Sequence, residues 1–306
     1  MKTSEVSVAE SGMRLDRWVK KNYPDITFVF LQKLLRKGGI KVDSKKAKPE
    51  QKLETGQQIS IIEFERREKT VKEKPPISAA MIERLQKAVI YKDENILAIN
   101  KPPGLAAQGG TNVKESVDEA LDFLKFGLDE RPRLVHRIDK DTSGVMLLAR
   151  NRKSAVTLGK MFKEKGIKKT YWALTAKVPE NIEGKISAPL AAKSSDGYSE
   201  KTSVDASGKK AITMYRVKEK VGEVAFVELE PLTGRMHQLR AHMAYIGCPI
   251  LSDGKYGGRE AFITGLSDKM HLHARSIEFK LSGKKIFVTA PMPEHMLESF
   301  KMLGLE

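Results

Sequence analysis

The feature that most constrains this chain is a charged segment that leads directly into a short apolar run. Residues 136–144 read His-Arg-Ile-Asp-Lys-Asp-Thr-Ser-Gly, and residues 145–149 read Val-Met-Leu-Leu-Ala. A run of this length and composition predicts a fully buried strand. A loop at the mouth of such a strand is fixed by the core while its side chains stay exposed. On residue type alone, Asp139 and Asp141 are candidates for a base, a nucleophile or a metal ligand, or for ion pairs in an ordinary surface turn.

The net charge narrows the choice of partner. The 306 residues include 55 Lys or Arg and 39 Asp or Glu, a formal net charge of +16, although 40% of the residues are hydrophobic. A folded protein with such an excess of positive charge is typical of polyanion binders, and nucleic acid is the commonest polyanion. A membrane surface is the weaker alternative, because the sequence contains no apolar run of 18 residues and no lipidation motif.

Cysteine usage and the first residues predict a cytoplasmic protein. Cys248 is the only cysteine, which excludes an internal disulfide and a cysteine-rich metal site. Residues 1–12 are polar and lack the apolar core of a secretory signal. No Cys or His cluster has the spacing of metal ligands, and no glycine-rich phosphate loop is present, so we expect no metal and no cofactor.

The amino-terminal third predicts a small basic module. Apolar residues recur at helical spacing from Met13 and again after Pro24, where the second helix ends at Gly38-Gly39; residues 40–42 and 57–61 then have strand character. Between positions 14 and 48 there are eleven Lys or Arg and only three Asp. Two short helices with basic faces can direct these cations to phosphates while their apolar faces pack inward against the strands. The cations expected to contact RNA are Arg14, Arg17, Lys33, Arg36, Lys37 and Lys41.

The aromatic start of the second helix has two interpretations. Phe28-Val29-Phe30 either fill the core of the module or stack on a nucleobase. We expect them in the core, which is where large apolar side chains are usually found.

A charged, proline-terminated segment divides the chain. Residues 63–76 have few large apolar side chains and end in Pro75-Pro76, a composition typical of an extended, solvated linker. A chain of this length also accommodates two domains. We predict a module at residues 1–66, a linker at 67–80 and a larger domain at 81–306.

The larger domain begins with a predicted β-hairpin. Residues 89–91 and 96–99 are apolar and flank a polar turn. The loops Asn100-Lys101-Pro102-Pro103-Gly104 and Gly109-Gly110 follow. Either loop can be an ordinary turn or a contact for RNA or substrate, and residue type alone favours the turn.

Two further stretches carry chemistry. Residues 168–174 have strand character, so Tyr171 is either a half-buried strand aromatic or a ring offered to a nucleobase. Residues 231–243 predict a loop followed by a helix, with Arg240 on the rim of its buried face. A guanidinium there needs a carboxylate partner, and an Asp of the 136–144 segment is a candidate. Side chains on the opposite face are expected to reach RNA or solvent: Arg235, Gln238 and His242.

These segments carry a specific resemblance. His136–Gly144, Lys169-Thr170-Tyr171-Trp172-Ala173 and Gly234–Arg240, in this order, resemble the ribosomal large-subunit pseudouridine synthase family. The basic segment Arg36–Leu53 and Tyr256-Gly257-Gly258-Arg259-Glu260 look most similar to its C-type branch, which modifies 23S ribosomal RNA. Asn100–Gly104 supports the likeness. The basic module resembles the S4 RNA-binding module through Arg14-Leu15-Asp16 and its glycine-containing turn.

The resemblance implies a fold, a reaction and roles for residues. It implies an α+β fold with a long mixed, largely antiparallel sheet and a central cleft, joined to a small S4-like module. It implies Asp139 as the nucleophile, Arg240 as its ion-pair partner and Tyr171 as the ring that stacks on the target base. Further RNA contacts are expected from the 136–144 segment and from the loop and helix of residues 231–243: Arg137, Arg235, His237 and Gln238. Asp141 is expected to cap or pair locally.

The expected function is therefore isomerisation of specific uridines to pseudouridine, without cofactor or metal. The expected partner is 23S ribosomal RNA or an assembling large subunit, not a membrane, and we expect a monomer. Two alternatives stay open: a synthase of the same family acting on tRNA or other ribosomal RNA positions, and a non-catalytic RNA-binding protein of the ribosome. A non-catalytic RNA-binding protein would not explain the charged segment around Asp139 or Arg240 on the rim of a buried helix face.

Overall fold

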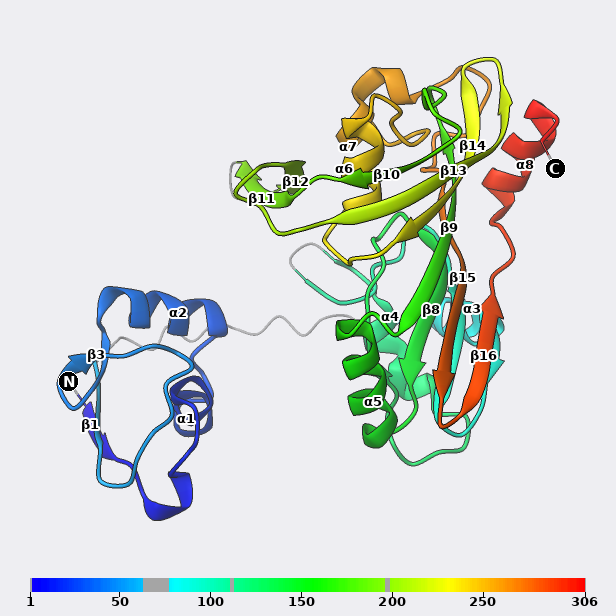
Figure 1. Ribbon diagram of the computed structural model, residues 1–306. Helices are drawn as coiled ribbons and strands as arrows, with labels where there is room; N and C mark the ends of the chain where they lie inside the picture. The colour runs from blue at the N-terminus through cyan, green and yellow to red at the C-terminus, as the bar shows by residue number, and fades with distance from the viewer. Residues whose placement is uncertain (1, 63–76, 111–112, 196–198, 306) are drawn as a thin grey trace. The chain divides into compact units, whose positions relative to one another are not determined.

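The computed structural model describes residues 2–62, 77–110, 113–195 and 199–305. The chain divides into two compact units, Met1–Glu73 and Lys74–Glu306, which are described separately (Figure 1). Most of the predicted linker, residues 67–80, lies outside the described residues. Its end is already helical, because Ser78 accepts a hydrogen bond from the Met81 amide and caps a helix that begins at Ala79.

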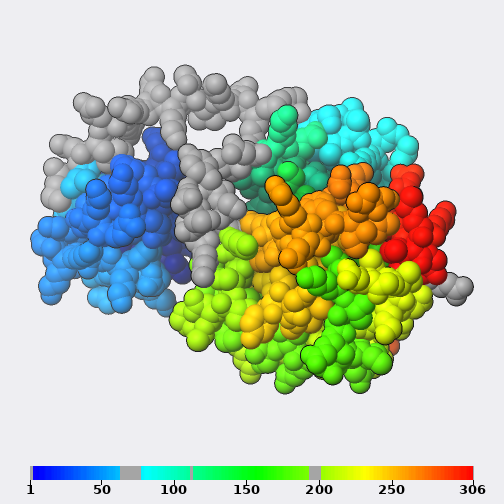
Figure 2. Space-filling view, turned by 90° about the horizontal axis from the view of Figure 1, so that it is seen from above, coloured from blue at the N-terminus to red at the C-terminus, as the bar shows by residue number. Residues whose placement is uncertain are grey.

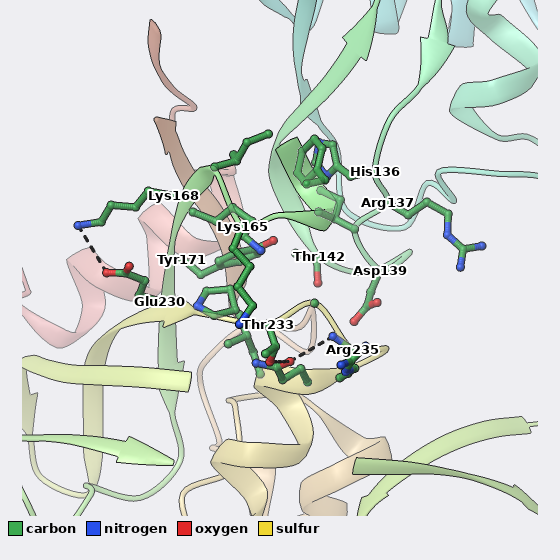
Figure 3. Close-up of a pocket in the computed structure, with 18 of the residues that line it drawn as sticks. His136, Arg137, Asp139, Thr142, Lys165, Lys168, Tyr171, Glu230, Thr233 and Arg235 are labelled. Carbon is green, nitrogen blue, oxygen red and sulfur yellow. Dashed lines mark hydrogen bonds and ion pairs between the residues drawn. The ribbon is translucent and has the colours of Figure 1, made fainter. Parts of the chain in front are cut away.

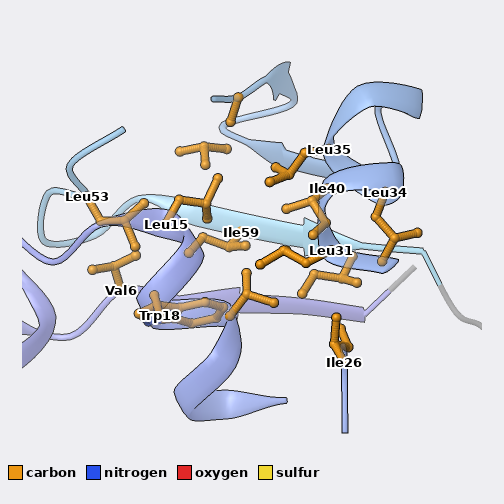
Figure 4. Packing of buried hydrophobic residues seen from close by; sticks show 14 residues of the cluster. Val6, Leu15, Trp18, Ile26, Leu31, Leu34, Leu35, Ile40, Leu53 and Ile59 are labelled. Atoms are coloured by element: carbon orange, nitrogen blue, oxygen red, sulfur yellow. The ribbon is translucent and has the colours of Figure 1, made fainter. Parts of the chain in front are cut away.

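The first unit packs two helices against a four-stranded sheet. Its sheet has the order β1-β4-β2-β3. Trp18 and Leu15 on the first helix and Leu31 and Leu35 on the second are buried against the strands (Figure 4). The elements are β1 Lys2–Glu5, η1 Val8–Glu10, α1 Leu15–Asn22, α2 Phe28–Lys37, β2 Ile40–Val42, β3 Lys45–Lys46 and β4 Gln58–Ile61.

The start of α2 departs from the sequence prediction. Thr27 caps this helix, and the Phe28 and Val29 side chains are 67% and 78% exposed, so the prediction that they fill the core is wrong. Phe30 does pack against the core. The first turn of a helix has no preceding turn to cover it, and of these three side chains only Phe30 is half-buried against the core cluster.

The second unit is built on a mixed, largely antiparallel sheet, as predicted. Its strand order is β10-β13-β14-β9-β15-β8-β6-β5, with β16 paired to β15 and β7 to β8. Only β15 and β8 run parallel; the other neighbours in this sheet are antiparallel. The strands are β5 Val89–Lys92, β6 Ile96–Lys101, β7 Arg133–Leu134, β8 Ser143–Ala149, β9 Ile167–Thr175, β10 Glu183–Ser187, β13 Ile212–Val221, β14 Val224–Pro231, β15 Leu272–Leu281 and β16 Lys284–Thr289.

Helices pack on this sheet, and one separate hairpin lies beside α6. In Figure 1, α5 lies beside the lower part of the sheet and α6 and α7 lie at its upper end. Seen from above, the orange atoms of the segment that contains α7 lie at the surface of this unit (Figure 2). The elements are α3 Ala79–Lys87, α4 Val117–Ala120, η2 Leu121–Leu124, α5 Arg152–Lys163, the hairpin β11 Leu190–Ser195 and β12 Ser199–Val204, α6 Gln238–Tyr245, α7 Gly254–Gly257, η3 Gly258–Ala261 and α8 Glu294–Leu303.

The predicted buried strand is β8, at the centre of the unit. All seven of its residues are buried. Gly144 is required at its start, because φ is +109° there and an added Cβ would collide with the Ala274 backbone of β15. This close approach holds the end of the charged segment against β15, which pairs on its other side with β9, the strand that carries Tyr171.

Buried histidines make the stability of this unit depend on pH. His271 and His273 are fully buried, and burial lowers the pKa of each to about 4. Both are therefore neutral in the folded state. Their contribution to stability is complete above the ordinary histidine pKa of 6.5 and is lost as the pH falls from there toward 4.

Between pH 7.5 and 5.5, His271 and His273 together should lower the unfolding free energy of the second unit by roughly 2–3 kcal/mol, since each contributes up to about 1.4 kcal/mol per pH unit. His136, whose pKa burial lowers to about 3, should add to this loss. Urea unfolding followed by the fluorescence of Trp172 measures this loss. The first unit is the control, because all six histidines lie in the second, and Trp18 should report no change. An unchanged Trp172 transition over this interval would contradict the prediction.

Candidate active site

Three distant segments of the second unit line one cavity. Its volume is about 1510 Å³, and its lining includes Asp139, Tyr171 and Arg240. Asp139 lies in the loop before β8, Tyr171 lies in β9, and Arg240 lies in α6. In Figure 3, Asp139 from the loop and Tyr171 from β9 reach toward the same space. The structure thus brings together the three residues for which the sequence predicted catalytic roles.

A buried lysine holds the loop that carries Asp139. The Lys101 side chain, at the end of β6, is fully buried, and its ammonium group donates to the carbonyl oxygens of Pro102, Leu105 and Lys140 at 2.8, 2.9 and 2.9 Å. The Gly104 amide donates to the same Lys140 carbonyl. Burial lowers the pKa of Lys101 to about 7, although Asp141 and Asp139 partly oppose this shift. The Lys-Pro-Pro-Gly loop is therefore a turn, and its hydrogen bonds to Lys140 hold the backbone next to Asp139.

Replacing Lys101 with Met should loosen this support. Methionine fills similar space but donates no hydrogen bond, so buried carbonyls lose their partner. We expect the second unit to be destabilised by about 2–4 kcal/mol and catalysis to slow, because the backbone next to Asp139 is no longer fixed. Urea unfolding and turnover of the purified variant measure the two effects. Lys92→Met, on the exposed end of β5, is the control. It should lower stability by no more than about 1 kcal/mol, through the contact of Lys92 with the Phe126 ring, and leave turnover unchanged.

Arg240 is held by a carboxylate that the sequence analysis did not identify. Its Nε and Nη2 atoms donate to the two oxygens of Asp253, each at 2.7 Å. Asp253 is fully buried and also caps α7. The remaining nitrogen, Nη1, faces Asp139 at 3.9 Å from Oδ2. Asp139 is therefore the secondary partner of Arg240 and Asp253 the primary one.

Tyr171 faces the cavity as a neutral phenol. The ring packs partly against two core clusters, one that contains Ala274 of β15 and one that contains Ala173 of its own strand. Burial, together with the negative charge of Asp139, raises the pKa of Tyr171 above its usual range. The hydroxyl therefore keeps its proton at neutral pH, and Tyr171 can offer a ring face and a proton rather than act as a base.

The expected solvent-facing side of α6 is buried. The predictions that Gln238 contacts RNA and that His242 reaches RNA or solvent are wrong, since they are 4% and 0% exposed. Gln238 accepts from Thr233 at 2.6 Å and donates to the Ile212 carbonyl at 2.9 Å, which ties the preceding loop to β13. The helical pattern assumed one open face, whereas α6 packs against β12, β13, β14 and α7.

The other predicted RNA contacts of this unit lie at the cavity. Arg137 and Arg235 are exposed and line it, and Figure 3 shows the Arg137 guanidinium directed away from Tyr171. His237 also lines the cavity, with Nε2 4.0 Å from Oδ1 of Asp139. Asp141 is exposed and is not part of the lining. Several further cations surround the cavity: Lys140, Lys163, Lys165, Lys168, Lys169, Lys280 and Lys285.

The cations of the first unit that were predicted to contact RNA lie mostly at the surface. Arg17, Lys33, Arg36 and Lys37 are exposed, and Lys41 is half-buried. Arg14 is exposed too, but it already forms an ion pair with Asp16 at 2.6 Å. Among the described residues, no helix has both the length and the apolar character needed to cross a membrane. No cluster of His, Cys, Asp or Glu that could hold a metal ion occurs in the same part of the chain.

Comparison with known proteins identifies relatives. Residues 95–245 match the family model described as RNA pseudouridylate synthase. The chain is 40% identical to ribosomal large subunit pseudouridine synthase C of Rickettsia felis, over 94% of this chain and 95% of that protein. It is 32% identical to the protein of the same name from Escherichia coli K12, over 99% and 97%.

Solved structures agree with these relatives. Human RNA pseudouridylate synthase domain containing 4 superposes with a TM-score of 0.63 at 28% identity, over 74% of this chain and 97% of that one. Human RNA pseudouridylate synthase domain containing 1 gives a TM-score of 0.58, also at 28% identity, over 72% and 86%.

Proposed function

The chain belongs to the RNA pseudouridylate synthase family, and we propose that it isomerises specific uridines of 23S ribosomal RNA to pseudouridine. The observation that carries this proposal is the meeting of Asp139, Tyr171 and Arg240 in one cavity with a basic rim. The relatives named for the ribosomal large subunit support the choice of RNA. We also propose that the protein acts as a monomer and in the cytoplasm, where a ribosomal RNA substrate would be met.

The reaction rearranges bonds without changing composition. The bond from N1 of uracil to C1′ of the ribose breaks, the base turns, and a bond from C5 to C1′ forms. C5 loses a proton and N1 gains one. A carboxylate serves each of the three routes to this product, namely attack on C1′, attack on the base and removal of a ribose proton. Because C1′ is hidden in stacked RNA, the target nucleotide enters the cavity flipped out.

The cavity assigns a task to each of the three residues. Asp139 acts as the nucleophile or base and is 26% exposed, so it is reachable from the cavity. Arg240 places a positive charge beside Asp139. Two hydrogen bonds to Asp253 fix the position of its guanidinium. Tyr171 presents a ring on which a uracil can stack and keeps the proton of its hydroxyl.

We also propose that residues 1–66 are an S4-like module that binds the same RNA. The exposed cations of α2, Lys33, Arg36 and Lys37, support this role. We expect the double variant Arg36→Gln with Lys37→Gln to weaken RNA binding and to reduce the salt dependence of log K by about 1 per lost phosphate contact. Arg14→Gln should weaken binding less, because Asp16 already neutralises Arg14. Filter binding at several salt concentrations measures both, and an unchanged salt slope for the double variant would contradict the proposal.

The substrate is tested with RNA that carries tritium at C5 of uridine. Formation of pseudouridine releases this tritium to water. We expect release from 23S ribosomal RNA and none from 16S ribosomal RNA or tRNA. Release from tRNA alone would instead assign the enzyme to tRNA, and no release from any of the three would overturn the proposal. Mapping of pseudouridine in ribosomal RNA from a deletion strain then identifies the positions.

A further inference from the structure

Asp139 is flanked by a second potential donor besides Arg240. Nη1 of Arg240 lies 3.9 Å from Oδ2 of Asp139, and Nε2 of His237 lies 4.0 Å from Oδ1. Each carboxylate oxygen therefore has its own nitrogen nearby. Both separations exceed a hydrogen bond, but hydrogen bonds of active sites often shorten only when the substrate is bound.

The backbone of His237 is held in an unfavourable conformation. Its φ of 50° and ψ of 23° lie in the left-handed region, which costs a residue with a Cβ about 1–2 kcal/mol. His237 is the N-cap of α6, yet its side chain makes no capping hydrogen bond. The ring is directed into the cavity instead, and this is the pattern expected where strain serves a site.

Tyr256 contacts the ring nitrogen of His237 that does not face Asp139. The Tyr256 hydroxyl lies 2.9 Å from Nδ1 of His237 and accepts a hydrogen bond from the Thr202 amide at 3.0 Å. With Thr202 as its donor, the hydroxyl is free to donate its own proton to Nδ1. The ring proton then sits on Nε2 and faces the Asp139 carboxylate, whereas the opposite tautomer would turn a lone pair toward a negative charge.

The surroundings keep this imidazole neutral. Burial, reinforced by Arg240 and Lys255, lowers the pKa of His237, although Asp139 and Asp253 oppose the shift. A neutral ring can donate a hydrogen bond to Asp139 without adding a second positive charge. A second cation beside Asp139 would weaken it as a nucleophile, because Arg240 already supplies one.

We propose that His237 is a positioning residue for the reaction: as the neutral Nε2–H tautomer, selected by Tyr256, it donates to Oδ1 of Asp139 and aims the carboxylate. The inference rests on the proposed function, since it needs Asp139 to be the reacting group. It assigns a role to α7 as well. The N-cap of this single turn, Asp253, accepts hydrogen bonds from Arg240, and Tyr256 within the turn contacts Nδ1 of His237.

Two substitutions of His237 separate the two ring nitrogens. In His237→Gln the amide nitrogen replaces Nε2 and still donates toward Asp139. In His237→Asn the amide reaches only the place of Nδ1, so contact with Tyr256 is kept and the donor to Asp139 is lost. We expect the single-turnover rate of tritium release to stay within about 3-fold for Gln and to fall about 100-fold for Asn. RNA affinity should not differ between the two variants. The melting temperature of the Asn variant should be no lower than that of the Gln variant, because Asn tolerates the left-handed backbone better, so a slower Asn variant cannot be explained by lost stability.

A double-mutant cycle tests the role of Tyr256. Phenylalanine keeps the ring that faces Arg240, whose guanidinium carbon lies 5.0 Å from the ring centre, and removes only the hydroxyl. We expect Tyr256→Phe to slow the wild type about 10-fold and the His237→Gln variant less than 2-fold, because a glutamine amide has no tautomer to select. An equal loss in both backgrounds would show that Tyr256 does not act through His237.

One measurement is independent of turnover. Nitrogen-15 NMR of ring-labelled protein should show a protonated Nε2 and an unprotonated Nδ1 at His237, and the opposite pattern would overturn the inference. Equal rates for wild type, His237→Gln and His237→Asn would also overturn it, as would equal loss in both variants. If the wild type itself released no tritium from any RNA, the proposed function would fail instead, so the two failures are distinguishable.

Discussion

Asp139→Asn should abolish tritium release from 23S ribosomal RNA while RNA binding persists. The amide has nearly the same shape, but it is neither a nucleophile nor a base at neutral pH. We expect the single-turnover rate to fall on the order of 10⁴-fold or more, the scale seen when a reacting group is removed. The affinity for RNA and its salt dependence should be nearly unchanged, because phosphate contacts dominate binding.

The neighbouring Asp141 is the matched control for this prediction. It lies two residues further along the same loop but is exposed and outside the cavity lining. Asp141→Asn should therefore keep a rate within about 2-fold of the wild type, as expected for a surface substitution. Normal turnover by Asp139→Asn together with an inactive Asp141→Asn would show that the roles of these two residues are exchanged.

Asp253→Asn should have the second largest effect. The substitution leaves the Arg240 guanidinium, whose side chain is 8% exposed, without its bidentate partner. Breaking a buried ion pair by removing one partner costs about 3–5 kcal/mol, because the remaining charge is not compensated. We also expect the rate of isomerisation to fall roughly 10- to 100-fold, because Arg240 loses the contact that orients it beside Asp139.

Urea unfolding followed by Trp172 fluorescence and single-turnover kinetics measure the two consequences. Glu183→Gln is the control, because Glu183 pairs with Arg216 at the surface, where both side chains are more than half exposed. That substitution should change neither stability nor rate. Equal stability of the Asp253 and Glu183 variants would contradict the view that Asp253 is the main partner of Arg240.

Local patterns were sufficient to predict much of the fold. The apolar run of residues 145–149 lies in a fully buried strand, β8, and the hairpin of β5 and β6 was predicted from two apolar segments around a polar turn. Such features depend on neighbours in the chain, which a sequence displays directly. The three chemical segments were identified in the same way, because each is a short contiguous motif.

The packing of α6 could not be predicted by this reasoning. Its helical periodicity suggested one open face, but Gln238 and His242 are buried. Both side chains form hydrogen bonds with Thr213 of β13, and His242 also contacts the Ala188 carbonyl just after β10. Likewise, Phe28 and Val29 looked like core residues and are exposed. Periodicity shows where apolar side chains recur along an element; what covers each face depends on elements from elsewhere in the chain.

The sequence by itself determined which groups are available for the chemistry: a carboxylate at Asp139, a guanidinium at Arg240 and a phenol at Tyr171. Only the tertiary structure decided that Asp253 clamps Arg240, that Lys101 holds the loop of Asp139 and that Tyr256 contacts His237. The reason is physical. These contacts are short-range and directional, and they form between segments that are separated along the chain and are brought together by the order of strands in the sheet.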